Sequence, residues 1–423
     1  MPLPRAVSLF RIVVLTGVGV LLAWLVGSRS LVAFLAASAP EAALWLAPND
    51  PEALLSLAER RLGTPGPLDA SAAQLADPAT RERVRGWAET ALVGDPLNAR
   101  ALRILGQVAL AAGDKARATV YLETAARHSI HESAALSWLM RTHYERKDYA
   151  SALYYADALL RTRNQAMADV LPLMGRMAET ADAVDELTKL LASNPPWRPA
   201  FLRVLPRAVA DAQTPLKLLL PLRQTATPPA LADIRDYIEL LVHHRFYELA
   251  SYTWLQFLPP EQLGGAGFLF NGSFEHAPSG VPFDWQIGGG TGVTASIAAR
   301  PDGEGARALF VELGPGRVDF GGVAQVLLLG PGAYRLSARH RGELAAPRGL
   351  VWRVACLNGP SIGQGPMALG AAPQWTETGF AFTVPEADCR AQQLRLVLDA
   401  RMPSEQLVSG SVWYDELRIA RED

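Results

Sequence analysis

The sequence predicts a multidomain chain, α then β, with an N-terminal membrane helix, an α-solenoid of helical hairpins and a C-terminal antiparallel β-sandwich. Three observations predict this order: an uncharged apolar run near the start, an internal 34-residue repeat, and a change from helical periodicity to period-2 alternation at Gly264-Gly265. The 423 residues suffice for two or three domains. A formal net charge of -2, without a dense Lys/Arg run, excludes the electrostatics of a nucleic-acid binder.

The apolar run is residues 12–27 (IVVLTGVGVLLAWLVG), which carry no charge. Apolar residues on both sides extend it toward the length of about 17–25 residues that a spanning helix needs. Arg5 and Arg11 precede the run, and Arg29 is the one basic residue that follows before Arg60. This asymmetry predicts a cytoplasmic tail (1–8), a membrane anchor with its juxtamembrane segment (9–37), and a periplasmic remainder.

From this segment we expect a single-pass protein of a bacterial inner membrane, with the C-terminal domains in the periplasm. The excess of Arg over Lys indicates a GC-rich genome and not a recognition surface. A cleaved signal peptide is the alternative, since Ala37-Ser38-Ala39 offers small residues for a cut. The apolar run ends about a dozen residues before that site, which favours a retained anchor. Both interpretations place residues 40–423 outside the cytosol.

The sequence pattern of residues 40–260 predicts a series of helical hairpins. Asn98–Ile130 and Glu132–Asn164 align at an offset of 34 residues, with small residues recurring where paired helices cross. This resembles the tetratricopeptide repeat, on Leu105-Gly106, Gly113, Ala118, Ala125 and the preceding Pro96. The resemblance is specific over about 80–164 and weaker elsewhere. It implies a stacked array whose groove binds a partner protein, although an array that serves only as a spacer is an open alternative.

Residues 265–423 predict a β-sandwich of the jelly-roll type, from alternating strands separated by Gly/Pro turns. Three segments resemble jelly-roll carbohydrate-binding modules of the galactose-binding-like type: 270–275 (FNGSFE) followed by Trp285, 332–337 (GAYRLS), and 412–417 (VWYDEL). In that family the first and last strands lie close together, and their acids often hold a structural calcium ion.

Glu275 and Asp415 are therefore the candidate calcium ligands. Asp415 alternates in phase with Trp413 and Leu417, and a carboxylate among inward apolar side chains is costly unless it is paired or liganded. Calcium with oxygen ligands is one solution, and hydrogen bonds from backbone amides in a turn are the other. We expect no other cofactor.

Sugar binding needs flat aromatic faces beside polar groups. Trp375 lies in the polar context PQWTE and is the first candidate for stacking on a sugar ring, with Trp285 as the second. Trp352 and Trp413 lie on apolar faces and are expected in the core. A structural sandwich that binds no sugar, or that contacts protein, is the alternative.

The two cysteines, Cys356 and Cys389, both lie in the predicted sandwich. Outside the cytosol a disulfide between them is expected, and two unrelated buried thiols are the alternative. By loop-entropy estimates the bridge is worth roughly 3–4 kcal/mol.

No motif predicts an enzyme: G-x-x-x-x-G-K-[ST] and H-E-x-x-H are absent from the sequence, and the G-x-S-x-G match at residues 359–363 (GPSIG) is followed by Gly and Pro in place of a helix. The first hypothesis is a membrane-anchored periplasmic scaffold of envelope polysaccharide assembly or export, whose helical groove binds a partner protein and whose sandwich contacts glycan. The second is a protein-protein adaptor with a purely structural β-domain. The third is a hydrolase of unfamiliar design.

Overall fold

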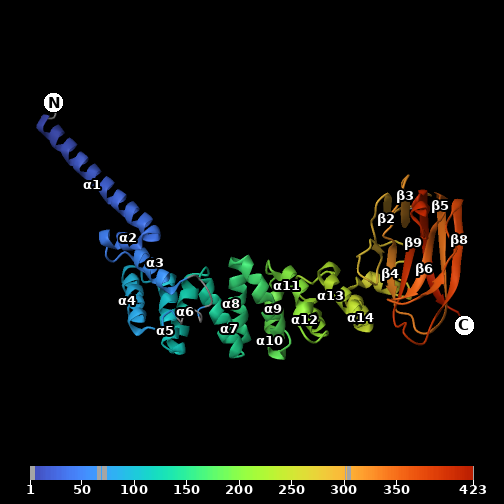
Figure 1. The fold of residues 1–423 in the computed structure, drawn as a ribbon, viewed down its shortest axis with the longest axis horizontal. Coiled ribbons are helices and arrows are strands. Elements are labelled where there is room, and N and C mark those ends of the chain that lie inside the picture. Colours follow the sequence, from blue (N-terminus) through green and yellow to red (C-terminus); the bar gives the residue numbers. More distant parts are fainter. Residues whose placement is uncertain (1–4, 64–67, 69–73, 301, 303–305, 423) are drawn as a thin grey trace. The chain divides into compact units, whose positions relative to one another are not determined.

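A computed structural model describes residues 5–63, 68, 74–300, 302 and 306–422 of the chain, with residues 5–13 as backbone only (Figure 1). It confirms the predicted fold class: an apolar N-terminal helix, a long helical region and a C-terminal sandwich of two antiparallel sheets. Residues 1–4 of the predicted tail lie outside the described residues.

Among the described residues up to 265, the helices follow one another without an intervening strand. They are α1 (Arg5–Ser38), α2 (Pro40–Leu46), α3 (Pro51–Leu62), α4 (Pro78–Gly94), α5 (Ala99–Ala111), α6 (Lys115–His128), α7 (Ser133–Glu145), α8 (Tyr149–Thr162), α9 (Met167–Met177), α10 (Ala181–Ala192), α11 (Arg198–Ala208), α12 (Thr214–Leu222), α13 (Leu231–His243) and α14 (Tyr247–Phe257), with 3-10 turns at Asn164–Ala166 and Pro260–Gly265.

The chain divides into two compact units. The first comprises Met1–Leu190 and Pro195–Trp197, and the second comprises Leu191–Asn194 and Arg198–Asp423. Helices α11 to α14 thus belong with the sandwich, whereas the sequence placed a boundary near residue 260. The reason is apolar packing: the ring of Trp254 on α14 lies 5.1 Å from that of Phe270 and 5.7 Å from that of Phe283.

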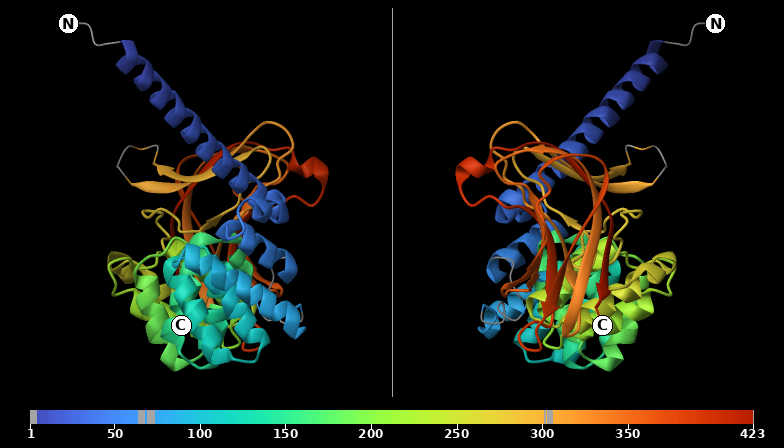
Figure 2. Two further views of the ribbon diagram at one scale, coloured as in Figure 1. Left: turned by 90° about the vertical axis from the view of Figure 1, so that its left-hand side faces the viewer. Right: turned by 90° about the vertical axis from the view of Figure 1, so that its right-hand side faces the viewer.

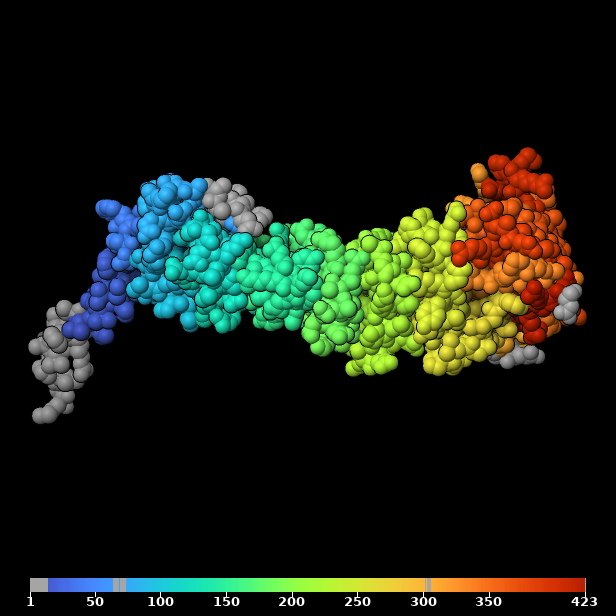
Figure 3. Space-filling model, turned by 90° about the horizontal axis from the view of Figure 1, so that it is seen from below, coloured from blue at the N-terminus to red at the C-terminus, as the bar shows by residue number. Residues whose placement is uncertain are grey.

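The apolar segment of helix α1 is exposed over most of its length, and its C-terminal end packs against α2 and α3. Its stretch Val14–Ser38 is long and apolar enough to cross a membrane, and the space-filling view shows this segment projecting from the helices that follow it (Figure 3). Ala36, near its end, is buried against Ala43 of α2 and Ala53 of α3. Arg60 of α3 donates to the carbonyl oxygens of Ala37 and Ser38, at 3.2 and 2.8 Å.

The 34-residue repeat shows in the helix starts. Helices α5 and α7 begin at Ala99 and Ser133, and α6 and α8 begin at Lys115 and Tyr149, so both pairs differ by 34. Asp114 and Asp148 precede the second helix of each hairpin and accept hydrogen bonds from backbone amides of its first turn. The structure is compatible with tetratricopeptide repeats, and that assignment stays a prediction.

Gly106 sets how closely α5 and α6 approach. A Cβ atom at this position would lie 2.7 Å from both Cγ and Cδ2 of Leu122, which is fully buried. In the next hairpin the equivalent positions, 34 residues on, are Met140 and Ala156, both buried. One hairpin therefore places a large residue on its second helix, and the other places it on the first.

We expect Gly106→Ala to destabilise the helical region by about 1–3 kcal/mol, because the added methyl group overpacks a closed contact. Adding Leu122→Ala should recover part of this loss. Gly86→Ala is the control, because its Cβ would meet nothing within 4 Å and alanine raises helix propensity. Urea unfolding followed by circular dichroism measures all three variants. Equal stability of Gly106→Ala and the natural chain would contradict the close contact.

In the described residues of the sandwich there are ten strands. They are β1 (Gln286–Ile287), β2 (Val293–Ala299), β3 (Arg307–Leu313), β4 (Val323–Leu327), β5 (Gly332–Ala345), β6 (Leu350–Cys356), β7 (Ser361–Gln364), β8 (Gly370–Val384), β9 (Gln392–Leu398) and β10 (Ser409–Arg421). The first sheet has the order β1-β4-β9-β6-β7, and the second has the order β2-β3-β10-β5-β8. All pairings are antiparallel, and the β2–β3 hairpin forms one edge of the second sheet (Figure 2).

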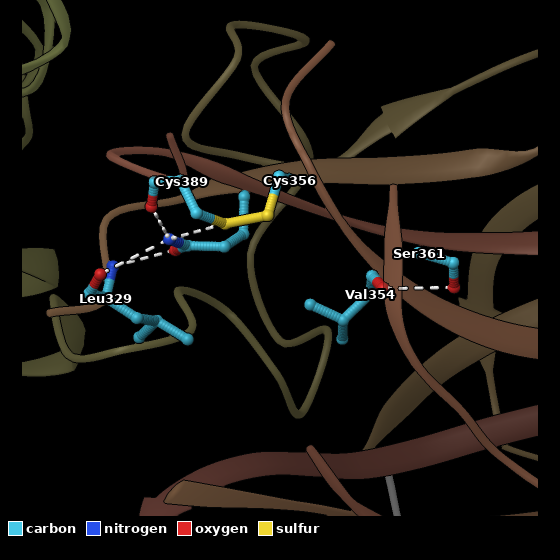
Figure 4. Close-up of a disulfide and its surroundings, with 6 residues drawn as sticks. Leu329, Val354, Cys356, Ser361 and Cys389 are labelled. Atoms are coloured by element: carbon cyan, nitrogen blue, oxygen red, sulfur yellow. Dashed lines mark hydrogen bonds between the residues drawn. A yellow bond between two sulfur atoms is a disulfide. The ribbon is translucent and has the colours of Figure 1, made fainter. Parts of the chain in front are cut away.

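One core lies between the two sheets. The predicted disulfide is confirmed: Cys356, at the end of β6, is bonded to Cys389, just before β9 (Figure 4). Beside it, the buried Gln392 side chain accepts from the amide of Leu329 at 2.9 Å and donates to the carbonyl oxygen of Cys389 at 2.6 Å. The bridge thus closes a chain segment that includes β7 and the long edge strand β8.

Candidate functional site

The outer face of the second sheet carries a cluster of charged and aromatic side chains. Along β10, Val412 and Tyr414 point into the core, so Trp413 and Asp415 point outward. A β-bulge follows, with a register shift between Asp415 and Arg418 and a positive φ of 50° at Glu416. The bulge returns the next apolar residue, Leu417, to the core.

This bulge corrects two sequence-based expectations. Asp415 was expected among inward apolar side chains, and Trp413 was expected in the core. Trp413 is instead half-buried on the outer face, with its ring 4.5 Å from that of Phe310. Simple alternation misplaced both residues because the extra residue of the bulge reverses the phase between Asp415 and Leu417.

Asp415 is buried on this outer face, where it forms an ion pair with Arg300. Arg300, which follows β2, donates from Nη1 to Oδ2 of Asp415 at 3.1 Å. The guanidinium of Arg300 also lies 4.8 Å from the ring centre of Trp375, on the opposite edge strand β8. The side chain of Arg300 is 11% exposed and that of Asp415 is 5% exposed, so this ion pair is largely withdrawn from water.

Burial raises the pKa of Asp415, and the positive charge of Arg300 opposes that rise. The carboxylates of Glu416 and Glu275 add to the upward shift. The backbone amide of Glu416 donates to Oδ1 of Asp415 at 2.7 Å and lowers the pKa. Both oxygens of this carboxylate therefore accept hydrogen bonds from donors of the chain itself.

Trp375 lies at the centre of this cluster and is half-buried. Its indole N–H donates to Asp302 at 3.0 Å, and the guanidinium of Arg339 lies 5.8 Å from its ring centre. Arg339 in turn donates to Glu416 at 2.8 Å. Two guanidinium groups near one indole ring are a cation–π arrangement, which fixes the ring in position.

A depression of about 400 Å³ lies on the same face, over β5, β8 and β10. Its polar lining combines cationic, anionic and hydroxyl groups: Arg335, Ser337, Arg339, Glu377, Thr378, Glu416 and Arg418. Arg339 belongs to both the depression and the Trp375 cluster. The face thus offers hydrogen-bond donors and acceptors next to an aromatic ring, which is the chemistry that binds polyhydroxylated ligands.

The second stacking candidate, Trp285, is corrected by the structure. It is fully buried, stacked on Phe274 at 5.1 Å between ring centres, and its indole N–H donates to the carbonyl oxygen of Asn271 at 2.8 Å. A ring enclosed in this way cannot offer a face to a sugar. Trp352, also expected in the core, is buried there.

The calcium prediction receives no support from these contacts. Glu275 is exposed and accepts from the amide of Arg307 at 3.3 Å, while Asp415 is paired with Arg300. A guanidinium already supplies the positive charge that a cation would bring, so the residues do not fit an ion between Glu275 and Asp415. Within the described part of the chain, no group of three His, Cys, Asp or Glu side chains could hold a metal. Calcium binding stays a prediction.

The first unit has a groove of its own, between α7 and α9. It has a volume of about 620 Å³ and its lining includes Met140, Arg141, Tyr144, Asp169 and Arg176. Arg141 and Arg176 are exposed, whereas Met140 lies buried at the base of the hairpin. Mixed charge over an apolar floor suits an extended peptide segment better than a small apolar molecule.

Comparisons with known proteins concern the sandwich alone. No family model and no curated protein sequence matches the chain. Among solved structures, the sandwich resembles carbohydrate-binding modules. They include a family 16 module (18% identity, 37% of this chain and 100% of that chain, TM-score 0.27), a family 61 module in complex with β-1,4-galactotriose (15%, 37% and 98%, 0.27), and a xylan-binding domain from Paenibacillus barcinonensis (18%, 35% and 90%, 0.24). At these identities and TM-scores the likeness does not extend to ligands.

Sequence reasoning missed Arg300 and the depression. Arg335, Ser337 and Arg339 alternate along β5 and were expected on a half-exposed strand, which was a usable signal for an outward polar face. Arg300 had no such signal, because it follows the last residue of β2 and reaches Asp415 from a distant part of the sequence.

Proposed function

We propose that the protein is a membrane-anchored periplasmic scaffold without enzymatic activity, whose groove between α7 and α9 binds a partner protein and whose sandwich contacts glycan. The glycan surface is the outer face of the second sheet, at Trp375 and the adjoining depression. A role in envelope polysaccharide assembly or export follows from this combination of parts.

The observation that carries the glycan proposal is the set of neighbours around Trp375. An aromatic ring held by Arg300 and Arg339 borders a depression with hydroxyl, carboxylate and guanidinium groups. Such groups bind sugar hydroxyls, and a pre-positioned ring loses little conformational entropy on binding. Helix α1 supports the anchor. Its apolar segment Val14–Ser38 is not buried against other described residues, except at its last turns.

A glycan array probed with the full chain in detergent tests this surface. We expect Trp375→Ala to weaken binding of the selected glycan at least about tenfold, which corresponds to about 1.4 kcal/mol. Trp413→Ala is the matched control, because Trp413 lies on the same face but packs against Phe310, whereas Trp375 packs against Arg339, which lines the depression. Circular dichroism checks that both variants fold. Equal loss in both variants, or retained binding in Trp375→Ala, would contradict the assignment.

A second candidate is a protein-protein adaptor whose sandwich is purely structural. One observation favours it: the ring of Trp375 already lies against guanidinium groups, and its N–H is already bonded to Asp302. In that case we expect no glycan on the array to bind. Pull-down with the natural chain should recover a protein partner, and pull-down with the Arg141→Glu variant should not.

A further inference from the structure

The junction between α1 and the first hairpin exposes large apolar side chains that no part of the described chain covers. Leu31 and Phe34 of α1 are 49% and 72% exposed, and Trp45 and Leu46 of α2 are 85% and 47% exposed. Trp45 is far more exposed than a tryptophan in a soluble surface usually is. An exposed apolar cluster of this kind on a folded helix pair indicates a surface that contacts a membrane or another protein.

The opposite face of α2 is fixed to the helical unit. Pro40 and Ala43 are buried, and Ala43 packs with Ala36 of α1 and Ala53 of α3. Arg60 holds the last carbonyl groups of α1. Helix α2 therefore cannot rotate to bury Trp45 without breaking these contacts, and its apolar outer face stays directed away from the hairpins.

The position of this surface along α1 matches the boundary of a bilayer. Residues 12–28 lie between Arg11 and Arg29 and carry no charge, and these 17 residues at a rise of about 1.5 Å span about 26 Å, which is most of a hydrocarbon core of about 30 Å. Arg29 then lies at the outer boundary, where its long side chain reaches the headgroups. Leu31 and Phe34 follow within the headgroup layer, less than about two helical turns beyond Arg29.

Helix α2 does not continue away from the bilayer. It turns at Ala39 and folds back beside the end of α1, as Figure 1 shows. Trp45 is the sixth of the seven residues of α2 and lies about 8 Å along the helix from Pro40. The turn thus carries Trp45 back toward the level of Arg29. Tryptophan is enriched at this level of membranes, because its ring is apolar and its N–H is polar.

We propose that α2 lies in the lipid headgroup layer and that Trp45, with Phe34 and Leu46, inserts at the boundary of the acyl chains. The first hairpin is thereby held directly on the outer surface of the bilayer, with a fixed orientation, and does not hang from a free linker. This inference rests on the membrane anchoring in the proposed function and adds a lipid-binding surface to it.

Spin labelling of the full chain in phosphatidylcholine–phosphatidylglycerol nanodiscs tests the proposal. Both cysteines are bonded to each other, so a single added cysteine can be labelled selectively. The variants are Trp45→Cys, Trp24→Cys within the apolar segment of α1, and Tyr154→Cys on α8, whose side chains are all well exposed. Collision with dissolved oxygen reports lipid, and collision with a water-soluble nickel complex reports water.

We expect the labels at positions 24 and 45 to show an oxygen-to-nickel ratio several-fold above that at position 154. A ratio at position 45 equal to that at 154, with position 24 still in lipid, would overturn the proposal and leave the anchor intact. Labels at 24 and 45 that both report water would instead refute membrane anchoring itself. The two failures are thus distinguishable in one experiment.

Discussion

Replacing Arg300 with methionine should destabilise the β-sandwich at neutral pH by about 3–5 kcal/mol, because it leaves the buried carboxylate of Asp415 without its positive partner. Methionine keeps much of the aliphatic length over Trp375, so the loss reports the charge rather than the packing. Arg339 is the nearest other cation to Asp415 in the sheet register, but its guanidinium is committed to Glu416. Denaturant unfolding monitored by tryptophan fluorescence measures the loss.

The loss should depend on pH in a defined direction. Burial raises the pKa of Asp415, and Arg300 opposes that rise, so Arg300→Met raises the pKa further. A carboxyl with a folded-state pKa above its unfolded value is favoured in the folded state when protonated. Its contribution is therefore fully present below the unfolded pKa and is lost as the pH rises through the folded pKa. The difference in unfolding free energy between the variant and the natural chain should therefore shrink as the pH is lowered toward the pKa of Asp415 in the unfolded chain.

Two further variants isolate the pair. Arg300 also pairs with Asp302, so adding Asp415→Asn to Arg300→Met removes one of the two carboxylates that lose their partner. It should recover part of the lost stability at neutral pH and give a favourable coupling energy in a double-mutant cycle. Arg418→Met is the control, since Arg418 is exposed on the same face and its change is expected to stay within about 0.5 kcal/mol. A deficit of Arg300→Met that is constant with pH and unrelieved by Asp415→Asn would show that packing, not charge, is lost.

The order and type of the elements could be predicted because they depend on local patterns. An uncharged run, a 34-residue recurrence of small residues and period-2 alternation can each be recognised in a short stretch of sequence, without knowledge of contacts between distant residues. The disulfide was predicted from two cysteines in one domain that was expected outside the cytosol, and the structure confirms the bond. The repeat period even placed the starts of α5 to α8 correctly relative to one another.

The site could be predicted only in part, because it depends on long-range register. Asp415 and Trp375 were both singled out, but nothing in the sequence shows that Arg300, from the far edge of the sheet, lies between them. The bulge at Glu416 is equally hidden, since glutamate is not a residue that marks a positive φ. The sequence therefore did not reveal that Asp415, a candidate calcium ligand, pairs with a guanidinium.

The second large effect concerns the bond between Cys356 and Cys389. Replacing both residues with alanine should lower the unfolding free energy of the sandwich by roughly 3–4 kcal/mol, because the bridge closes a loop of 33 residues in the unfolded chain. The loop contains β7 and the edge strand β8, so their docking on the two sheets becomes more costly in entropy. The polar contacts of Gln392 with Leu329 remain, which should preserve the native fold at moderate temperature.

Guanidinium unfolding of the natural chain, with and without reductant, and of the double variant separates the contribution of the bridge from that of the side chains. Reductant should lower the midpoint of the natural sandwich to that of the double variant and leave the double variant unchanged. Helices α3 to α8 belong to the other compact unit, so an ellipticity transition from them should keep its midpoint and serve as the internal control. If the double variant matches the oxidised chain, the bridge contributes no net stability, and the sandwich core alone determines how firmly β8 and Trp375 are held.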